Sequence, residues 1–109
     1  MKILSVSVAV LTGACAVATD LRGTFSDTGE RFTGQSINLS GNYYAGTLQL
    51  LLVGGVKCDG VYAIDRATAE GHAKFHCSDG RSGRMSIKST GWAGSAHGHI
   101  GDRAFTLVF

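Results

Sequence analysis

Residues 57–77 read KCDGVYAIDRATAEGHAKFHC, and this stretch decides the fold. Two runs within it, 57–64 and 70–77, alternate apolar with polar residues, a pattern typical of half-buried β-strands. A turn centred on Ala67 and Thr68 places Cys58 opposite Cys77. Directly opposed cysteines on antiparallel strands lie near bridging distance. The stretch therefore predicts a hairpin closed by a Cys58–Cys77 disulfide.

The same register also aligns the apolar face of this hairpin. It sets large residues against small ones: Ile64 against Gly71, Tyr62 against Ala73 and Gly60 against Phe75. Glycine inside a strand lowers strand propensity and often marks close packing. We expect these glycines to make room for bulky side chains inside a tightly curved sheet.

Turn signals recur on both sides of this hairpin, and no segment keeps an apolar period of 3.6 residues. The turns are Thr28-Gly29, Ser40-Gly41-Asn42, Gly54-Gly55, Asp79-Gly80, Thr90-Gly91 and Gly101-Asp102. Eight strands are predicted, near 21–27, 30–39, 43–53, 57–64, 70–77, 83–89, 92–100 and 103–109. The fold class is all-β: a small eight-stranded antiparallel up-and-down meander, closed or nearly closed into a soluble β-barrel with one disulfide.

Each turn also implies a register between its two strands. The Gly101-Asp102 turn pairs Gly98 with Phe105 and Ala96 with Leu107. The remaining turns imply the pairs Phe25 with Phe32, Phe32 with Leu50, Leu50 with Gly60, Phe75 with Met85, and Met85 with Ala96. The pairing of Phe75 with Met85 requires a bulge between Ser78 and Ser82.

A barrel that crosses the outer membrane is the alternative, because Phe105–Phe109 is similar to the closing strand of such proteins. Several predicted strands are shorter than the 9 to 11 residues that membrane strands need. The face opposite the apolar one carries charged residues such as Arg31, Lys74 and Arg84. We therefore expect the apolar face to point inward and the barrel to be soluble.

Composition limits the chain to one small exported domain. It has 109 residues, of which 44% are apolar and 17% charged, with a formal charge of +2, 16 glycines, 3 cysteines and no proline. These values exclude a charge-rich disordered tail, a coiled coil and a basic nucleic-acid-binding domain. A core this small is marginally stable and often needs a covalent cross-link.

The N-terminus has the pattern of an export signal over residues 1–18, which leaves a single β domain over 19–109. Lys2 precedes an apolar run over 3–11 that is too short to span a bilayer. Ala16-Val17-Ala18 fits an A-x-A cleavage site and would release a protein that starts at Thr19. The segment Leu11-Thr12-Gly13-Ala14-Cys15 resembles a bacterial lipobox, in which cleavage precedes an acylated cysteine.

Cysteine counting favours the lipobox. If Cys58 and Cys77 pair, Cys15 is left over, and a lipid on Cys15 accounts for it. We therefore expect a membrane anchor at Cys15, and Ala16 in place of Asp after the cysteine implies the outer membrane, with the domain on its periplasmic or outer surface. A soluble secreted or periplasmic protein remains the alternative.

The second half of the chain carries a recognisable pattern. Cys77-Ser78-Asp79-Gly80-Arg81-Ser82-Gly83, followed by Gly94, Gly98 and Phe105–Phe109, resembles small Gly-rich exported proteins and lipoproteins of proteobacteria over residues 44–109. In size, lipid signal and inferred barrel the chain is also similar to the periplasmic lysozyme-inhibitor lipoproteins. Neither resemblance implies an activity or a role for any one residue.

Four histidines raise the question of a metal site. His72 and His76 share a face of one predicted strand, and His97 and His99 share a face of another, so zinc or copper ligation is conceivable. The predicted register places His97 beside Arg84, and a nearby cation disfavours a bound metal ion. Serines occur without a nucleophile-elbow motif. We expect no metal, no cofactor and no catalytic residue.

The outer face is the candidate binding surface. It gathers basic side chains with Asp59 as the single acid among them: Lys57, His72, Lys74, His76, Arg84, Lys88 and His97. Such a cluster suits an anionic partner, for example a lipid phosphate, a peptidoglycan carboxylate or an acidic protein patch. The expected function is a non-enzymatic cell-envelope lipoprotein that binds an anionic or protein partner.

Three other functions remain open. An inhibitor of a cell-wall hydrolase would use the acidic loop ends near Asp27, Glu30 and Asp102, because lysozymes are generally basic. The other two are a secreted β protein with a structural role and a small hydrolase.

Overall fold

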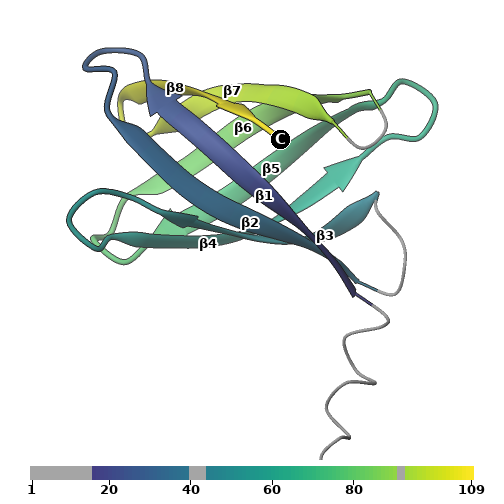
Figure 1. The fold of residues 1–109 in the computed structure, drawn as a ribbon, viewed down its shortest axis with the longest axis horizontal. Coiled ribbons are helices and arrows are strands. Elements are labelled where there is room, and N and C mark those ends of the chain that lie inside the picture. Colours follow the sequence, from purple (N-terminus) through teal and green to yellow (C-terminus); the bar gives the residue numbers. More distant parts are fainter. Residues whose placement is uncertain (1–15, 40–43, 91–92) are drawn as a thin grey trace, which may run out of the picture.

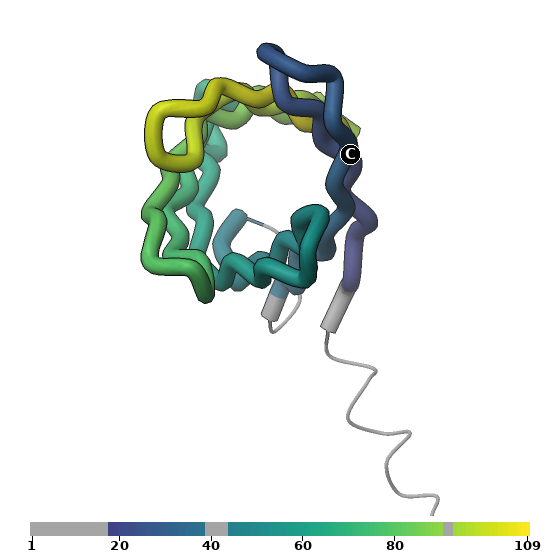
Figure 2. The backbone as a smooth tube through the Cα atoms, turned by 90° about the vertical axis from the view of Figure 1, so that its left-hand side faces the viewer, coloured from purple at the N-terminus to yellow at the C-terminus, as the bar shows by residue number. Residues whose placement is uncertain are grey.

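The computed structural model describes residues 16–39, 44–90 and 93–109, which form eight strands and no helix. The strands are β1 (Ala16–Phe25), β2 (Arg31–Leu39), β3 (Ala45–Leu51), β4 (Lys57–Ile64), β5 (Glu70–Cys77), β6 (Ser82–Ser89), β7 (Gly94–Ile100) and β8 (Arg103–Val108). Consecutive strands pair antiparallel, and β8 pairs back with β1 to close the barrel (Figures 1 and 2). The predicted all-β meander barrel is confirmed.

Strand alternation sorts the side chains into an inner and an outer set. In β5, residues alternate without exception between exposed and buried from Glu70 to Cys77. The buried apolar residues of all eight strands form one cluster inside the barrel, with Phe25, Phe75, Phe105, Leu50 and Ile100 among the largest fully buried side chains. The predicted apolar face thus points inward, and the outer face carries the polar residues.

One end of the barrel is packed with aromatic rings. Phe25, Phe32, Phe75 and Phe105 contact one another with ring centroids 5.2 to 6.4 Å apart. The hairpins β1–β2, β3–β4, β5–β6 and β7–β8 all turn at this end, which lies at the left of Figure 1. We call it the aromatic end.

The disulfide between Cys58 and Cys77 is confirmed. The two residues are directly opposed in β4 and β5, with Cα atoms 3.8 Å apart. The Ser78 N–H donates to the Lys57 carbonyl oxygen at 2.7 Å, so Lys57 and Ser78 form a hydrogen-bonded pair. The next pair along the strands, Cys58 and Cys77, is therefore a pair without backbone hydrogen bonds between its members. In antiparallel sheets the side chains of such pairs lie closest together.

Two of the predicted registers are confirmed, those of the hairpin 57–77 and of the last hairpin. The other five are wrong by two residues. The observed pairs are Gly23 with Phe32, Gly34 with Leu50, Leu50 with Cys58, Ala73 with Met85, and Met85 with Gly98. Because the strand period is two, this shift leaves every side chain on its predicted face.

Loop lengths explain the shifts. The Phe25 N–H donates to the Glu30 carbonyl at 2.8 Å, so the first loop has four residues and not two. Between β5 and β6 the Cys77 N–H donates to the Arg81 carbonyl, and Gly80 adopts a φ of 94° within the turn. The expected bulge before Ser82 is therefore replaced by a tighter turn.

β1 begins earlier than the predicted start at residue 21. Ala16, Val17 and Ala18 pair with β2, whereas β8 pairs with β1 only from Arg22 to Phe25. Cys15 and the lipobox lie outside the described residues, as do Gly41, Asn42 and Trp92. Within the described ranges no helix is long and apolar enough to cross a membrane.

Candidate functional site

Outward side chains form rows that cross the strands, because the registers align them pairwise. Lys74 in β5 lies opposite Arg84 in β6, and Arg84 lies opposite His99 in β7. All three side chains are exposed. We call Lys74, Arg84 and His99 the basic row.

Lys74 and Arg84 are like charges in directly opposed positions. Such cross-strand pairs destabilise a sheet, whereas opposite charges stabilise it. Within the described part of the chain, neither cation forms an ion pair with an acidic side chain. A bound anion would relieve this repulsion.

Two shallow grooves flank the basic row. The first lies between this row and the side chains of His72, Ser86 and His97, which follow one another across β5, β6 and β7. The second lies on the other flank, beside His76 and Ser82. The basic row therefore borders both grooves, and four imidazoles surround the two cations.

Other members of the predicted cluster lie at its margin or outside it. His76 lies opposite Asp59, and its Nδ1 is 2.9 Å from Ser82 Oγ. Lys88 lies opposite Glu70, with Nζ 3.9 Å from the carboxylate, and both side chains are largely exposed. Such surface pairs contribute little stability.

Lys57 does not join the cluster. It lies at the start of β4, opposite Leu51, and lines a different groove on the β1–β4 side of the barrel. Five basic side chains therefore line the first groove: His72, Lys74, Arg84, His97 and His99.

The expected contact between His97 and Arg84 is wrong. Arg84 lies opposite His99, and His97 lies opposite Ser86, because the β6–β7 register differs by two residues from the prediction. His99 was therefore missed as a site residue. Its position two residues after His97, and so on the same face of the predicted strand, was the sequence signal that could have identified it. Among the described residues, no three His, Cys, Asp or Glu side chains are close enough to hold a metal ion.

Two acidic residues of the aromatic end, Asp27 and Glu30, are bound to a single cation, Arg103. Arg103 donates to Asp27 through Nε and Nη2 at 3.1 and 3.0 Å, and Nη2 lies 3.4 Å from Glu30. The hydrogen bonds from Arg103 hold the pKa of the Asp27 carboxyl below its usual value. A hydrolase inhibitor would need Asp27 and Glu30 as contact residues, but in this fold both bind Arg103 and so hold β8.

Inside the barrel, polar groups lie towards the end opposite the aromatic end. Asn38 is the buried polar side chain of the described core, with 5% exposure. Its Oδ1 has no hydrogen-bond partner among the described residues. Tyr62 is partly buried, and this burial raises the pKa of its hydroxyl. The buried side chains at the aromatic end are apolar.

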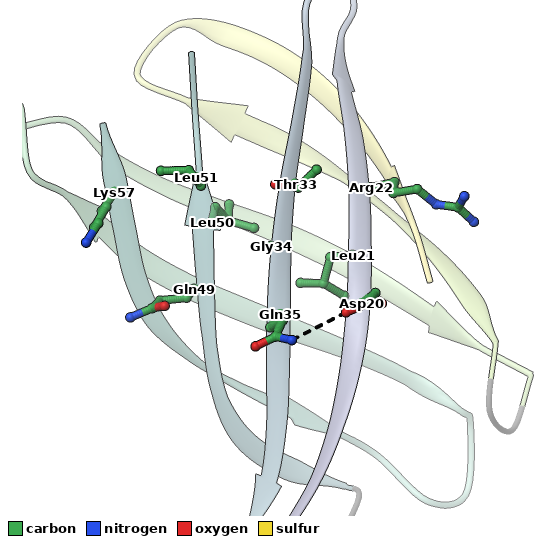
Figure 3. Close-up of a pocket in the computed structure, with 10 residues that line it drawn as sticks. All are labelled: Asp20, Leu21, Arg22, Thr33, Gly34, Gln35, Gln49, Leu50, Leu51 and Lys57. Atoms are coloured by element: carbon green, nitrogen blue, oxygen red, sulfur yellow. Dashed lines mark hydrogen bonds between the residues drawn. The ribbon is translucent and has the colours of Figure 1, made fainter. Parts of the chain in front are cut away.

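A third groove lies on the outer face of β1–β4 (Figure 3). One wall is the row Asp20, Gln35 and Gln49, in which each residue opposes the next; Asp59, opposite Gln49, continues this row beside the groove. The other wall is the row Arg22, Thr33, Leu51 and Lys57. Between the walls lie the backbones of Leu21, Gly34 and Leu50, and the Leu21 and Leu50 side chains belong to the interior. We call this the amide groove.

Comparisons of the chain with models of protein families, with curated proteins and with solved structures found no match.

Proposed function

We propose that this protein is a non-enzymatic bacterial cell-envelope lipoprotein whose barrel binds an anionic partner through the basic row. The observation that carries the proposal is the direct opposition of Lys74 and Arg84 without an acidic partner in the described chain. A fold that only needed solubility would gain stability from opposite charges at these positions.

The chemistry of the row suits phosphate or carboxylate groups. Arginine presents a planar set of donors that matches both groups, and lysine adds a compact point charge. Adjacent strands are about 4.8 Å apart, so the three side chains can contact neighbouring anionic groups of one ligand or of a lipid surface.

Two further observations support the envelope and the lipid anchor. A buried disulfide such as Cys58–Cys77 is typical of proteins that fold in oxidising compartments. Cleavage before Cys15 would preserve the pairing of Ala16, Val17 and Ala18 with β2, whereas cleavage after Ala18 would remove it. The lipobox route therefore keeps β1 intact.

Inhibition of a basic cell-wall hydrolase receives less support. It would need free carboxylates at the loop ends, but Arg103 already binds Asp27 and Glu30. Of these three acids, Asp102 is the one that Arg103 does not bind in the described chain. We therefore place the interaction on the strand face and not on the loops.

The test is a charge-reversal variant, Lys74→Glu, Arg84→Glu and Lys88→Glu, assayed on vesicles of phosphatidylglycerol mixed with phosphatidylcholine, and on peptidoglycan. The matched control reverses three cations on the β1–β4 side: Arg22→Glu, Arg31→Glu and Lys57→Glu. Each cation near an anionic surface contributes about 1 kcal/mol, so the first variant should bind at least about tenfold more weakly. The control should retain most of the binding.

Salt provides a further readout. Binding should weaken as ionic strength rises towards about 0.15 M, where charges beyond about 8 Å are screened. Equal binding by the charge-reversal variant and the wild type would show that the basic row is only a solvated surface.

A further inference from the structure

We propose that the amide groove on β1–β4 is a second binding site, which takes an uncharged, hydroxyl-rich oligosaccharide. It is independent of the basic row, because β2 and β3 lie across the barrel from β6 and β7 (Figure 2). The proposal rests on the groove's shape, on its hydrogen-bonding groups and on its balance of charge.

The shape suits an extended ligand. The groove has a volume of about 700 Å³ and is open to solvent. Its two walls run across four strands, so it extends over three strand spacings of about 4.8 Å, or about 14 Å. Figure 3 shows the two walls as rows above and below Gly34. A short linear oligosaccharide can lie along this length.

The middle of one wall holds the only two glutamines of the chain, Gln35 and Gln49, directly opposed on β2 and β3. A carboxamide both donates and accepts hydrogen bonds, as does a sugar hydroxyl. Gln35 Nε2 donates to Asp20 Oδ1 at a long distance of 3.4 Å. Both glutamines are exposed, so their carboxamides can pair with hydroxyls of a bound ligand.

Charge is balanced at each end of the groove. Asp20 faces Arg22 across one end, and Lys57 lines the other end, with Asp59 two residues along β4 beside the groove. Neither pair forms an ion pair in the described chain. Together with the neighbouring Asp59, the two carboxylates and two cations sum to zero, so the groove does not attract a strongly charged ligand. Each of these groups can bind a hydroxyl, and the carboxylates disfavour polyanions.

The opposite wall adds an apolar contact. Leu51 is 49% exposed between Thr33 and Lys57, and it can pack against the C–H face of a sugar ring. An extended peptide fits less well, because it binds sheets by adding to a free edge, whereas this groove crosses paired strands. Single-stranded nucleic acid needs aromatic side chains for stacking, and none of the described residues that line this groove is aromatic.

The test uses the full mature protein and the side-chain amide signals of Gln35 and Gln49 in NMR spectra. Hexamers of N-acetylglucosamine and of glucose are the neutral probes, and a hexamer of galacturonate is the acidic one. We expect a neutral hexamer to shift both glutamine signals with a Kd of about 1 mM. The hexamer that binds more tightly distinguishes acetylated from plain sugars.

The matched variants separate the groove from the rest of the outer face. Gln35→Ala with Gln49→Ala should weaken binding about tenfold, because two hydrogen-bonding groups are lost. Ser86→Ala on β6, across the barrel from β2, should leave the Kd unchanged, and so should the charge-reversal variant of Lys74, Arg84 and Lys88.

Three outcomes would overturn the proposal. One is the absence of a glutamine shift with either neutral hexamer at about 10 mM. Another is galacturonate binding as tightly as the neutral sugars. The third is a Kd within about twofold of wild type for the double glutamine variant, provided that its backbone spectrum shows the native fold.

Discussion

Arg103 in β8 holds Asp27 of the β1–β2 loop through two hydrogen bonds, and its guanidinium carbon lies 3.9 Å from the centre of the Phe25 ring. β1 and β8 share paired positions only from Arg22 to Phe25, so the seam that closes the barrel is short. Arg103 therefore joins the first hairpin to the last strand beside this seam.

This contact predicts a specific pH dependence. The hydrogen bonds from Arg103 lower the pKa of Asp27, whose ordinary value is 3.8. A lowered carboxyl pKa stabilises the fold above about pH 4, and the gain is lost as the pH falls through the folded-state value. Asp27→Asn should therefore lower the urea midpoint at about pH 6, and the difference from wild type should shrink at about pH 3.

Asp102→Asn is the control for this measurement, because Asp102 is an exposed loop residue at the same end. It should have little effect at either pH. A deficit of Asp27→Asn that is equally large at both pH values would contradict the expectation.

The disulfide should supply a large share of the stability of so small a domain. Cys58 and Cys77 are 19 residues apart, and closing a loop of this length contributes about 3 kcal/mol in the chain-entropy model. Cys58→Ala with Cys77→Ala should lower the free energy of unfolding by about this amount in urea titrations. The wild type in reductant should behave likewise, and a loss below about 1 kcal/mol would refute the estimate.

Gly98 should tolerate no side chain. A Cβ there would overlap the Arg84 carbonyl oxygen and lie 2.7 Å from the Cα of Met85. The β6 backbone cannot move away easily, because it is paired with β7. Gly98→Ala should cost about 2 to 3 kcal/mol of unfolding free energy through overpacking. Ser86→Ala, exposed on the same pair of strands, should change it by less than about 0.5 kcal/mol. Similar values for the two variants would disprove the steric argument.

Acylation of Cys15 predicts a difference in membrane partitioning. Wild type expressed in a bacterial host should enter the detergent phase, and Cys15→Ser should stay in the aqueous phase or remain unprocessed. Mass spectrometry of the mature N-terminus reads the cleavage site directly. An unmodified N-terminus at Thr19 in the wild-type protein would favour the A-x-A route and a soluble protein.

Sequence periodicity predicted the inner and outer faces of the strands but not most registers. Hydrophobic alternation specifies a residue's face, and a shift by two residues conserves it. Register also depends on the number of residues in each loop, as Phe25 shows by pairing with Glu30 across a four-residue turn. The hairpin of Cys58 and Cys77 was placed correctly because the two cysteines add a constraint that the other hairpins lack.

The same limit applies to the sites. Lys74 and Arg84 were placed on one face, but their direct opposition needed the true β5–β6 register. Gln35 and Gln49 carried no signal of their own, because separated glutamines on two strands form a row only when those strands are paired. Arg103 was missed because its partners, Asp27 and Glu30, are distant in sequence.

The aromatic end makes resistance to local opening uneven along the barrel axis. The ring cluster, the disulfide and the Arg103 contact all lie at or near this end, whereas Tyr62, Ile64 and Phe109 are only partly covered towards the other. Amide protons near Phe25, Cys58 and Phe105 should exchange with solvent only on global unfolding. The amide protons of Ala63 and Ser95 should exchange through local openings of lower free energy. The barrel should therefore fray from the end where Ala16 lies.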